Sequence, residues 1–270
     1  MSSEQVKKHP FHMVEPSGWP IVGTIGAFVM AVGGIWYMQE GPLYGFLAGL
    51  AIVLYCMFGW WRDVVKEAQN GEDHTPVVQH GLRVGMILFI ASEVMFFVAF
   101  FWAYFHSSVP ALSSLAHETW PPEGIVPLHT WSLPFYNTII LLSSGVTLTW
   151  AHHALQKGDY SKLRLGLLMT VALGFLFIGL QAYEYSEAMF GITDGIYPST
   201  FYLATGFHGF HVFVGACFLT VNYLRASSGH FTPKQHVGFE AAAWYWHFVD
   251  VVWVFLFIWI YWWGSYGYQY

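Results

Sequence analysis

Charged side chains are scarce in this chain of 270 residues, since Asp, Glu, Lys and Arg together make up only 10% of it. Soluble domains usually contain about 25% charged residues. Hydrophobic residues reach 56% and aromatic residues 20%, which is more apolar surface than one soluble core could bury. Lipid is the solvent that accepts such an excess. The composition therefore predicts an integral membrane protein.

Basic residues and cysteines are also few. Ten Lys and Arg stand against sixteen Asp and Glu, and the net charge is −6. Because no basic patch is present, we expect no nucleic-acid partner. Cys56 and Cys217 each lie in an apolar run, and we interpret them as core residues rather than as a disulfide or a metal pair. The first nineteen residues are polar, so we expect no cleavable signal peptide.

The motifs of most catalytic chemistries are missing. The sequence contains no P-loop, no GxSxG, no CxxC and no E-x-x-H motif. No apolar run contains an interior Lys, which excludes a retinal Schiff base. We therefore expect no catalytic residue and no metal ligand in this chain. Spacing alone leaves His152, His208 and His247 open as ligands of a membrane haem.

Seven apolar runs are long enough to cross a hydrocarbon core of about 30 Å, which takes about 20 helical residues. They must be helical, because an isolated strand would leave backbone groups unpaired in lipid. The sequence predicts an all-α membrane protein with seven transmembrane helices in a single membrane domain, 1–270. The predicted helices are Pro20–Met38, Leu43–Trp61, Leu82–Phe105, Leu133–Leu155, Leu163–Tyr185, Phe201–Tyr223 and Ala241–Trp262.

The basic residues predict the orientation. All ten Lys and Arg lie before the first run, or around the connections between runs two and three, four and five, and six and seven. With seven crossings they all reach one side, which the positive-inside rule assigns to the cytoplasm or to the mitochondrial matrix. We therefore expect the N-terminus inside and the C-terminus outside.

Glu93 is a carboxyl group near the middle of the third run. A charged group at that depth costs several kcal/mol, so we expect Glu93 to be protonated or paired with a donor on another helix. Two interpretations stay open. Glu93 either handles protons or belongs to a packed polar cluster without proton traffic.

Two further pairs form an intramembrane polar cluster in the prediction. His208 and His211 lie three residues apart in the sixth run, and His247 and Asp250 do so in the seventh, which also begins next to Glu240. Residues three apart share a helix face. We favour contacts between helices as the role of these residues over binding of haem or metal.

Several long strings are distinctive, among them WWRDVVKEA at 60–68, HTPVVQHGLRVGMILFIASEVMFF at 74–97, SSGVTLTWAHHAL at 143–155, ATGFHGFHV at 204–212 and GFEAAAWYWHFVDVVW at 238–253. With these strings the sequence resembles cytochrome c oxidase subunit III over almost the whole chain. The resemblance implies two helix groups, helices 1–2 and helices 3–7, around a V-shaped cleft filled with lipid. It also implies that Glu93 is the family's buried helix-three carboxyl group. The residues that it assigns to lipid binding are Trp61, Lys66, Glu67, His74, Phe89, Arg225 and His230.

The resemblance also implies the partners and the location. The chain would hold no cofactor except bound phospholipid, while haem a, haem a3 and copper would lie in partner subunits. It would contact subunit I directly, join subunit II and small subunits, and meet cytochrome c only transiently through the complex. The membrane would be a bacterial cell membrane or the mitochondrial inner membrane. The alternatives are subunit III of a ubiquinol oxidase, a stand-alone proton-coupled transporter that uses Glu93, and a haem-binding electron carrier.

Overall fold

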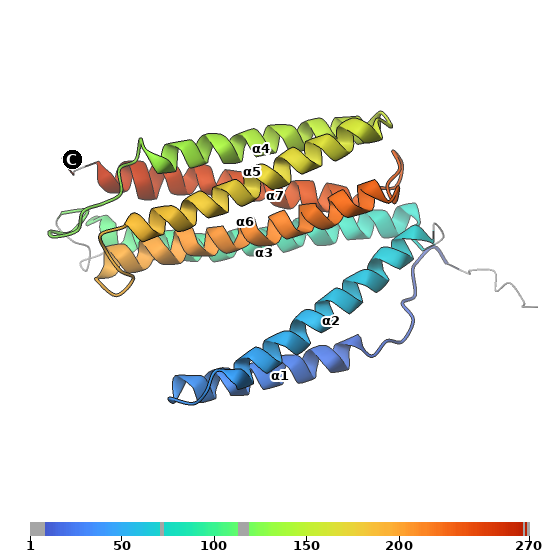
Figure 1. Cartoon of the computed structure of the whole chain (residues 1–270), viewed down its shortest axis with the longest axis horizontal. Coiled ribbons are helices and arrows are strands. Elements are labelled where there is room, and N and C mark those ends of the chain that lie inside the picture. The colour runs from blue at the N-terminus through green and yellow to red at the C-terminus, as the bar shows by residue number, and fades with distance from the viewer. Residues whose placement is uncertain (1–8, 71–72, 113–118, 267, 269–270) are drawn as a thin grey trace, which may run out of the picture. The chain divides into compact units, whose positions relative to one another are not determined.

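The structure is a computed structural model, and it describes residues 9–70, 73–112, 119–266 and 268. All regular structure in these residues is helical (Figure 1), as predicted. The seven α-helices are α1 Trp19–Met38, α2 Tyr44–Gln69, α3 Pro76–Ser108, α4 Leu133–Gln156, α5 Tyr160–Glu187, α6 Ile196–Ser227 and α7 Val237–Leu256. A π-helix, η1 Phe257–Trp262, and a 3₁₀ turn, η2 Trp263–Ser265, continue α7. Each predicted run therefore corresponds to one helix.

Six of the helices in the described part of the chain are long and apolar enough to cross a membrane, and α4 is the exception. Two threonines of α4 find hydrogen-bond partners on neighbouring helices. Thr147 Oγ1 lies 2.8 Å from Thr170 Oγ1, and the Trp253 indole donates to Thr138 Oγ1 at 2.9 Å. These polar groups of α4 therefore bond to other helices rather than facing lipid.

The chain divides into two compact units, residues 1–82 and 83–270. In the first unit, α1 and α2 form a hairpin in which glycines let the backbones approach. A Cβ on Gly33 would overlap the backbone of Gly45 and Phe46, and one on Gly49 would overlap the backbone of Met30. At the other end of the hairpin, the Trp19 indole donates to Asp63 at 2.8 Å. Gly45 and Gly49 thus mark a packing face, as small residues do in membrane helices.

Two adjacent glycines allow a test of this packing. We expect Gly33→Val to destabilise the α1–α2 hairpin by about 1–3 kcal/mol or more, because overpacking forces the backbone apart. The same change at Gly34 should have a much smaller effect, since its Cβ would meet only Phe46 at an ordinary 3.5 Å. Crosslinking yield between cysteines placed on α1 and α2 measures the hairpin in both variants. Equal yields for Gly33→Val and Gly34→Val would contradict the close approach.

In the second unit, α4, α5, α6 and α7 pack in a ring, each against the next, and α7 closes the ring on α4. Helix α3 lies outside this ring and contacts α6 and α7 through large aromatic side chains. Phe97 packs against Phe207 at 5.3 Å between ring centroids, and Phe101 packs against Phe255 at 4.6 Å. The packing of α3 on α6 and α7 is therefore strongly aromatic.

The wide π-turn at the end of α7 leaves backbone carbonyls that side chains satisfy. The Tyr104 hydroxyl donates to the Trp259 carbonyl at 3.1 Å, and the Thr130 hydroxyl donates to the Tyr261 carbonyl at 2.9 Å. In lipid every backbone group needs such a partner. These two bonds tie α3 and the loop before α4 to the end of the chain.

The six basic residues of the second unit gather at one end of its helices. This end holds the start of α3, the α4–α5 turn and the α6–α7 connection (Figure 1). At the α4–α5 turn, Asp159 caps α5 by accepting from the Lys162 N–H at 3.1 Å, and its other oxygen lies 2.7 Å from the Lys162 ammonium. These interactions with Lys162 lower the pKa of Asp159 below its usual value. We call this the basic end of the unit.

Candidate functional site

Glu93 and His211 form a carboxyl contact between helices α3 and α6 of the second unit. Glu93 Oε2 on α3 lies 2.9 Å from His211 Nε2 on α6, and both side chains are largely buried. The rings of Phe97 and Phe207 pack against the imidazole, with centroids 5.1 and 4.5 Å away. The partner of Glu93 on another helix is therefore a histidine.

The hydrogen bond of His211 Nδ1 limits which atoms of the Glu93–His211 pair can carry a proton. His211 Nδ1 lies 2.8 Å from the Phe207 carbonyl, which can only accept, so Nδ1 carries a hydrogen. The 2.9 Å contact then needs one more proton, either on Glu93 or on Nε2. In both forms the pair is neutral overall. A neutral pair that shares one proton is the form that burial in a low dielectric favours.

His208 takes no part in that pair although it lies one turn away. It is fully buried, and its Nε2 lies 3.1 Å from the Val249 carbonyl on α7. Its ring packs between Phe177 and Trp253. His208 and His211 therefore bond to different elements, and in this geometry they are contacts between helices, the role that the sequence analysis favours.

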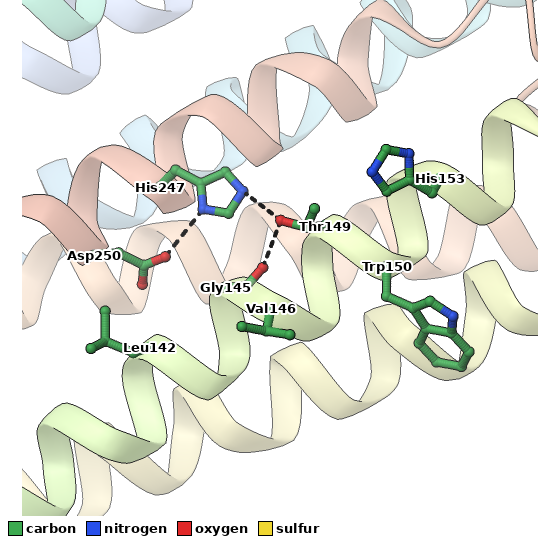
Figure 2. Close-up of a pocket in the computed structure, with 8 residues that line it drawn as sticks. All are labelled: Leu142, Gly145, Val146, Thr149, Trp150, His153, His247 and Asp250. Atoms are coloured by element: carbon green, nitrogen blue, oxygen red, sulfur yellow. Dashed lines mark hydrogen bonds and ion pairs between the residues drawn. The ribbon is translucent and has the colours of Figure 1, made fainter.

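A shallow groove between α4 and α7, with a mostly apolar lining, contains the other predicted pair (Figure 2). His247 Nδ1 lies 3.2 Å from Asp250 Oδ2, and His247 Nε2 lies 3.3 Å from Thr149 Oγ1. Thr149 in turn donates to the Gly145 carbonyl at 3.0 Å. This chain of bonds connects the two helices, and its side chains point toward one another across the groove.

Comparison with known proteins identifies the family. A profile of the family described as cytochrome c oxidase subunit III matches residues 9–265. The protein named cytochrome c oxidase subunit 3 of Marchantia polymorpha is 56% identical over 261 residues, which are 96% of this chain and 98% of that protein. Proteins with the same name from Arabidopsis thaliana and Tetraodon nigroviridis are 55% and 53% identical, with 96% and 95% of this chain and 98% of each relative aligned. This chain belongs to the cytochrome c oxidase subunit III family.

The lipid-binding residues that the subunit III resemblance implies fall in both units. In the first unit, Trp61 and Lys66 are exposed on α2, and the Lys66 ammonium lies 3.5 Å from Asp63. Glu67 follows on the same helix, and the backbone carbonyl of His74 accepts from the Gln79 amide at 3.0 Å. Their role in lipid binding stays a prediction.

The remaining three of these residues lie in the second unit. Phe89 stacks on Tyr245, with centroids 6.3 Å apart. The Arg225 guanidinium sits 4.5 Å from the centre of the Phe231 ring. The backbone N–H of His230 donates to the Arg225 carbonyl at 3.0 Å, which places these two residues side by side at the basic end.

Sequence reasoning missed two polar clusters in this subunit III chain. Glu184 is only 1% exposed, and it accepts from the Tyr261 hydroxyl at 2.7 Å and from the Gln181 amide at 3.2 Å. The Arg83 guanidinium donates to Glu240 at 2.7 Å. A signal for the first cluster was available, because Gln181 and Glu184 share a helix face at spacing i, i+3.

Proposed function

We propose that this chain is a core subunit without a redox centre in a proton-pumping cytochrome c oxidase, which passes electrons from cytochrome c to O2. The observation that carries the proposal is the match to subunit III along nearly the whole chain, at 51–56% identity to proteins from plants and algae. A match of this length and strength covers all seven helices, so it involves the whole fold rather than one motif.

The redox groups belong to partner subunits in this proposal. Haem a, haem a3 and copper lie in partner subunits, and this chain packs directly on subunit I. Small subunits complete the assembly, and cytochrome c meets it only transiently. Both ring nitrogens of His211 and of His247 already have hydrogen-bonding partners, which supports this division.

Bound phospholipid is the remaining component. We place anionic headgroups at Trp61, Lys66, Glu67, His74 and Phe89, in a lipid-filled cleft between helices 1–2 and 3–7, and at Arg225 with His230. Aromatic and cationic groups side by side at a helix end suit an anionic headgroup. Arg225 supports this assignment further, because its buried Nε has no hydrogen-bond partner among the described residues.

The proposed role is to stabilise subunit I, to support proton uptake into it and to provide oxygen with a route through lipid. The basic end of the helices faces inward under the positive-inside rule, so the N-terminus is inside and the C-terminus outside. The membrane is a bacterial cell membrane or the mitochondrial inner membrane. The comparisons do not favour the alternatives, a ubiquinol oxidase subunit or a stand-alone transporter.

Purification of the tagged chain tests the proposal. When the chain is extracted from its native membrane in mild detergent, we expect a haem-copper subunit to co-purify with it. The purified complex should then show a Soret band. The chain separated from its partners should show no Soret band. If the chain came out alone, or kept a haem after separation, the proposal would fail.

A further inference from the structure

Three potential metal ligands converge at the basic end of the second unit. They are His152 in the last turns of α4, His236 directly before α7 and Glu240 in the first turn of α7. One ligand atom from each lies within 4.8 Å of the other two. The residues are partly or fully buried, so the cluster is sheltered from bulk water.

The ring of His236 is held in an orientation that suits a ligand. Its Nδ1 lies 3.0 Å from the Thr232 carbonyl, so Nδ1 carries the hydrogen and donates it. Its Nε2 then turns toward the cluster, 3.4 Å from Glu240 Oε1. A histidine ligand commonly has this arrangement, with one N–H anchored to a carbonyl and the other nitrogen aimed at the metal.

Glu240 is fixed from the opposite side. Arg83 donates to Glu240 Oε2 at 2.7 Å, which leaves Oε1 directed at His236. A ligating carboxylate usually has such an outer partner. The His152 ring stands edge-on to the His236 ring, with centroids 5.6 Å apart, and packs on Phe239 at 5.3 Å. All three candidate ligands are therefore oriented by neighbours outside the cluster.

We propose that His152, His236 and Glu240 bind one divalent transition-metal ion, with zinc as the best fit. Two imidazoles and one carboxylate are a known zinc donor set, with a fourth position for water. Tetrahedral coordination at about 2.0–2.1 Å needs ligand atoms roughly 3.4 Å apart, so the side chains have only a short distance to move. The ion would join α4 to α7 without redox chemistry.

This proposal revises our expectation that the chain contains no metal ligand. That expectation rested on the missing E-x-x-H motif, whereas the sequence here reads His-x-x-x-Glu at 236–240 and the third ligand comes from another helix. The proposal does not depend on the oxidase role, because the cluster lies wholly within this chain.

The experiment uses the full chain with a tag free of histidine, purified in mild detergent and stripped with a chelator. Zinc binding is measured by competition with a chromophoric chelator. We expect one zinc per chain in the unmodified protein and in the control His153→Ala, which changes the neighbouring residue on α4. Zinc should bind at least tenfold more weakly in His152→Ala and in His236→Ala. Equal zinc binding in all four proteins, or no stoichiometric zinc in the unmodified chain, would overturn the site.

Cobalt provides a test that does not require loss of binding. Co2+ in a tetrahedral site of nitrogen and oxygen ligands absorbs weakly in the visible range. We expect His236→Cys to keep Co2+ and to add an intense thiolate-to-metal band in the near ultraviolet. In the control His153→Cys that band should be absent. The band in both variants, or in neither, would contradict ligation by residue 236.

Discussion

Replacing Trp246 by Ala should cost about 3–5 kcal/mol of stability, since that is the usual range for removing a buried tryptophan from a core. Trp246 is fully buried in the second unit, and its indole donates to Ser144 Oγ at 2.9 Å. Two glycines make room for the ring: a Cβ would approach it to 2.6 Å at Gly174 and to 2.9 Å at Gly215. The ring thus joins α7 to α4, α5 and α6, and neighbours that lack side chains cannot collapse into the space that it leaves.

The measurement is the temperature at which the purified chain loses its near-ultraviolet circular dichroism, which reports fixed aromatic packing. Trp246→Phe is the matched control, because it keeps most of the ring and removes only the indole donor. We expect the Phe variant to lie much closer to the unmodified chain than the Ala variant does. If both variants had melting temperatures close to that of the unmodified chain, Trp246 would not be the residue that joins the four helices.

The helices could be predicted from the sequence because a single long apolar segment can satisfy its backbone hydrogen bonds in hydrocarbon only as a helix. The ends of the helices were less predictable. Helix α3 starts at Pro76 and α6 at Ile196, each several residues before its apolar run. An apolar run marks only the part of a helix that lies in hydrocarbon, and the helix can extend beyond it. The polar nature of α4 was not read as a sign of burial, because a single sequence does not show which face a helix turns toward its neighbours.

The hydrogen-bond partners of the buried polar groups could not be predicted from the sequence, for a different reason. Glu93 and His211 are 118 positions apart, and Glu184 and Tyr261 are 77 apart. Spacing along one helix shows which residues share a face, but it does not show which helix lies opposite. A need for a partner at Glu93 could therefore be predicted from the cost of burial, whereas the identity of that partner came only from the packing of α3 on α6.

Loss of the Glu93–His211 pair should have the second large effect on the stability of the chain. We expect His211→Leu to destabilise the second unit by about 1–3 kcal/mol, because it leaves a buried carboxyl group without its partner. Glu93→Gln should be much milder. The Gln amide can donate to the unprotonated Nε2 of a neutral His211, whose Nδ1 hydrogen stays on the Phe207 carbonyl, so the pair remains neutral and bonded. The same circular dichroism melt measures both variants.

The double variant with Glu93→Leu and His211→Leu shows how much of the lost stability comes from leaving one buried partner unpaired. Removing both partners takes away the desolvation cost, so the double change should recover part of the stability lost in His211→Leu. Proton pumping by the assembled oxidase then decides between the two roles of Glu93. A packed polar pair predicts near-normal pumping in Glu93→Gln with the subunit still bound. A large loss of pumping in that variant, with assembly intact, would show instead that the carboxyl group itself carries protons.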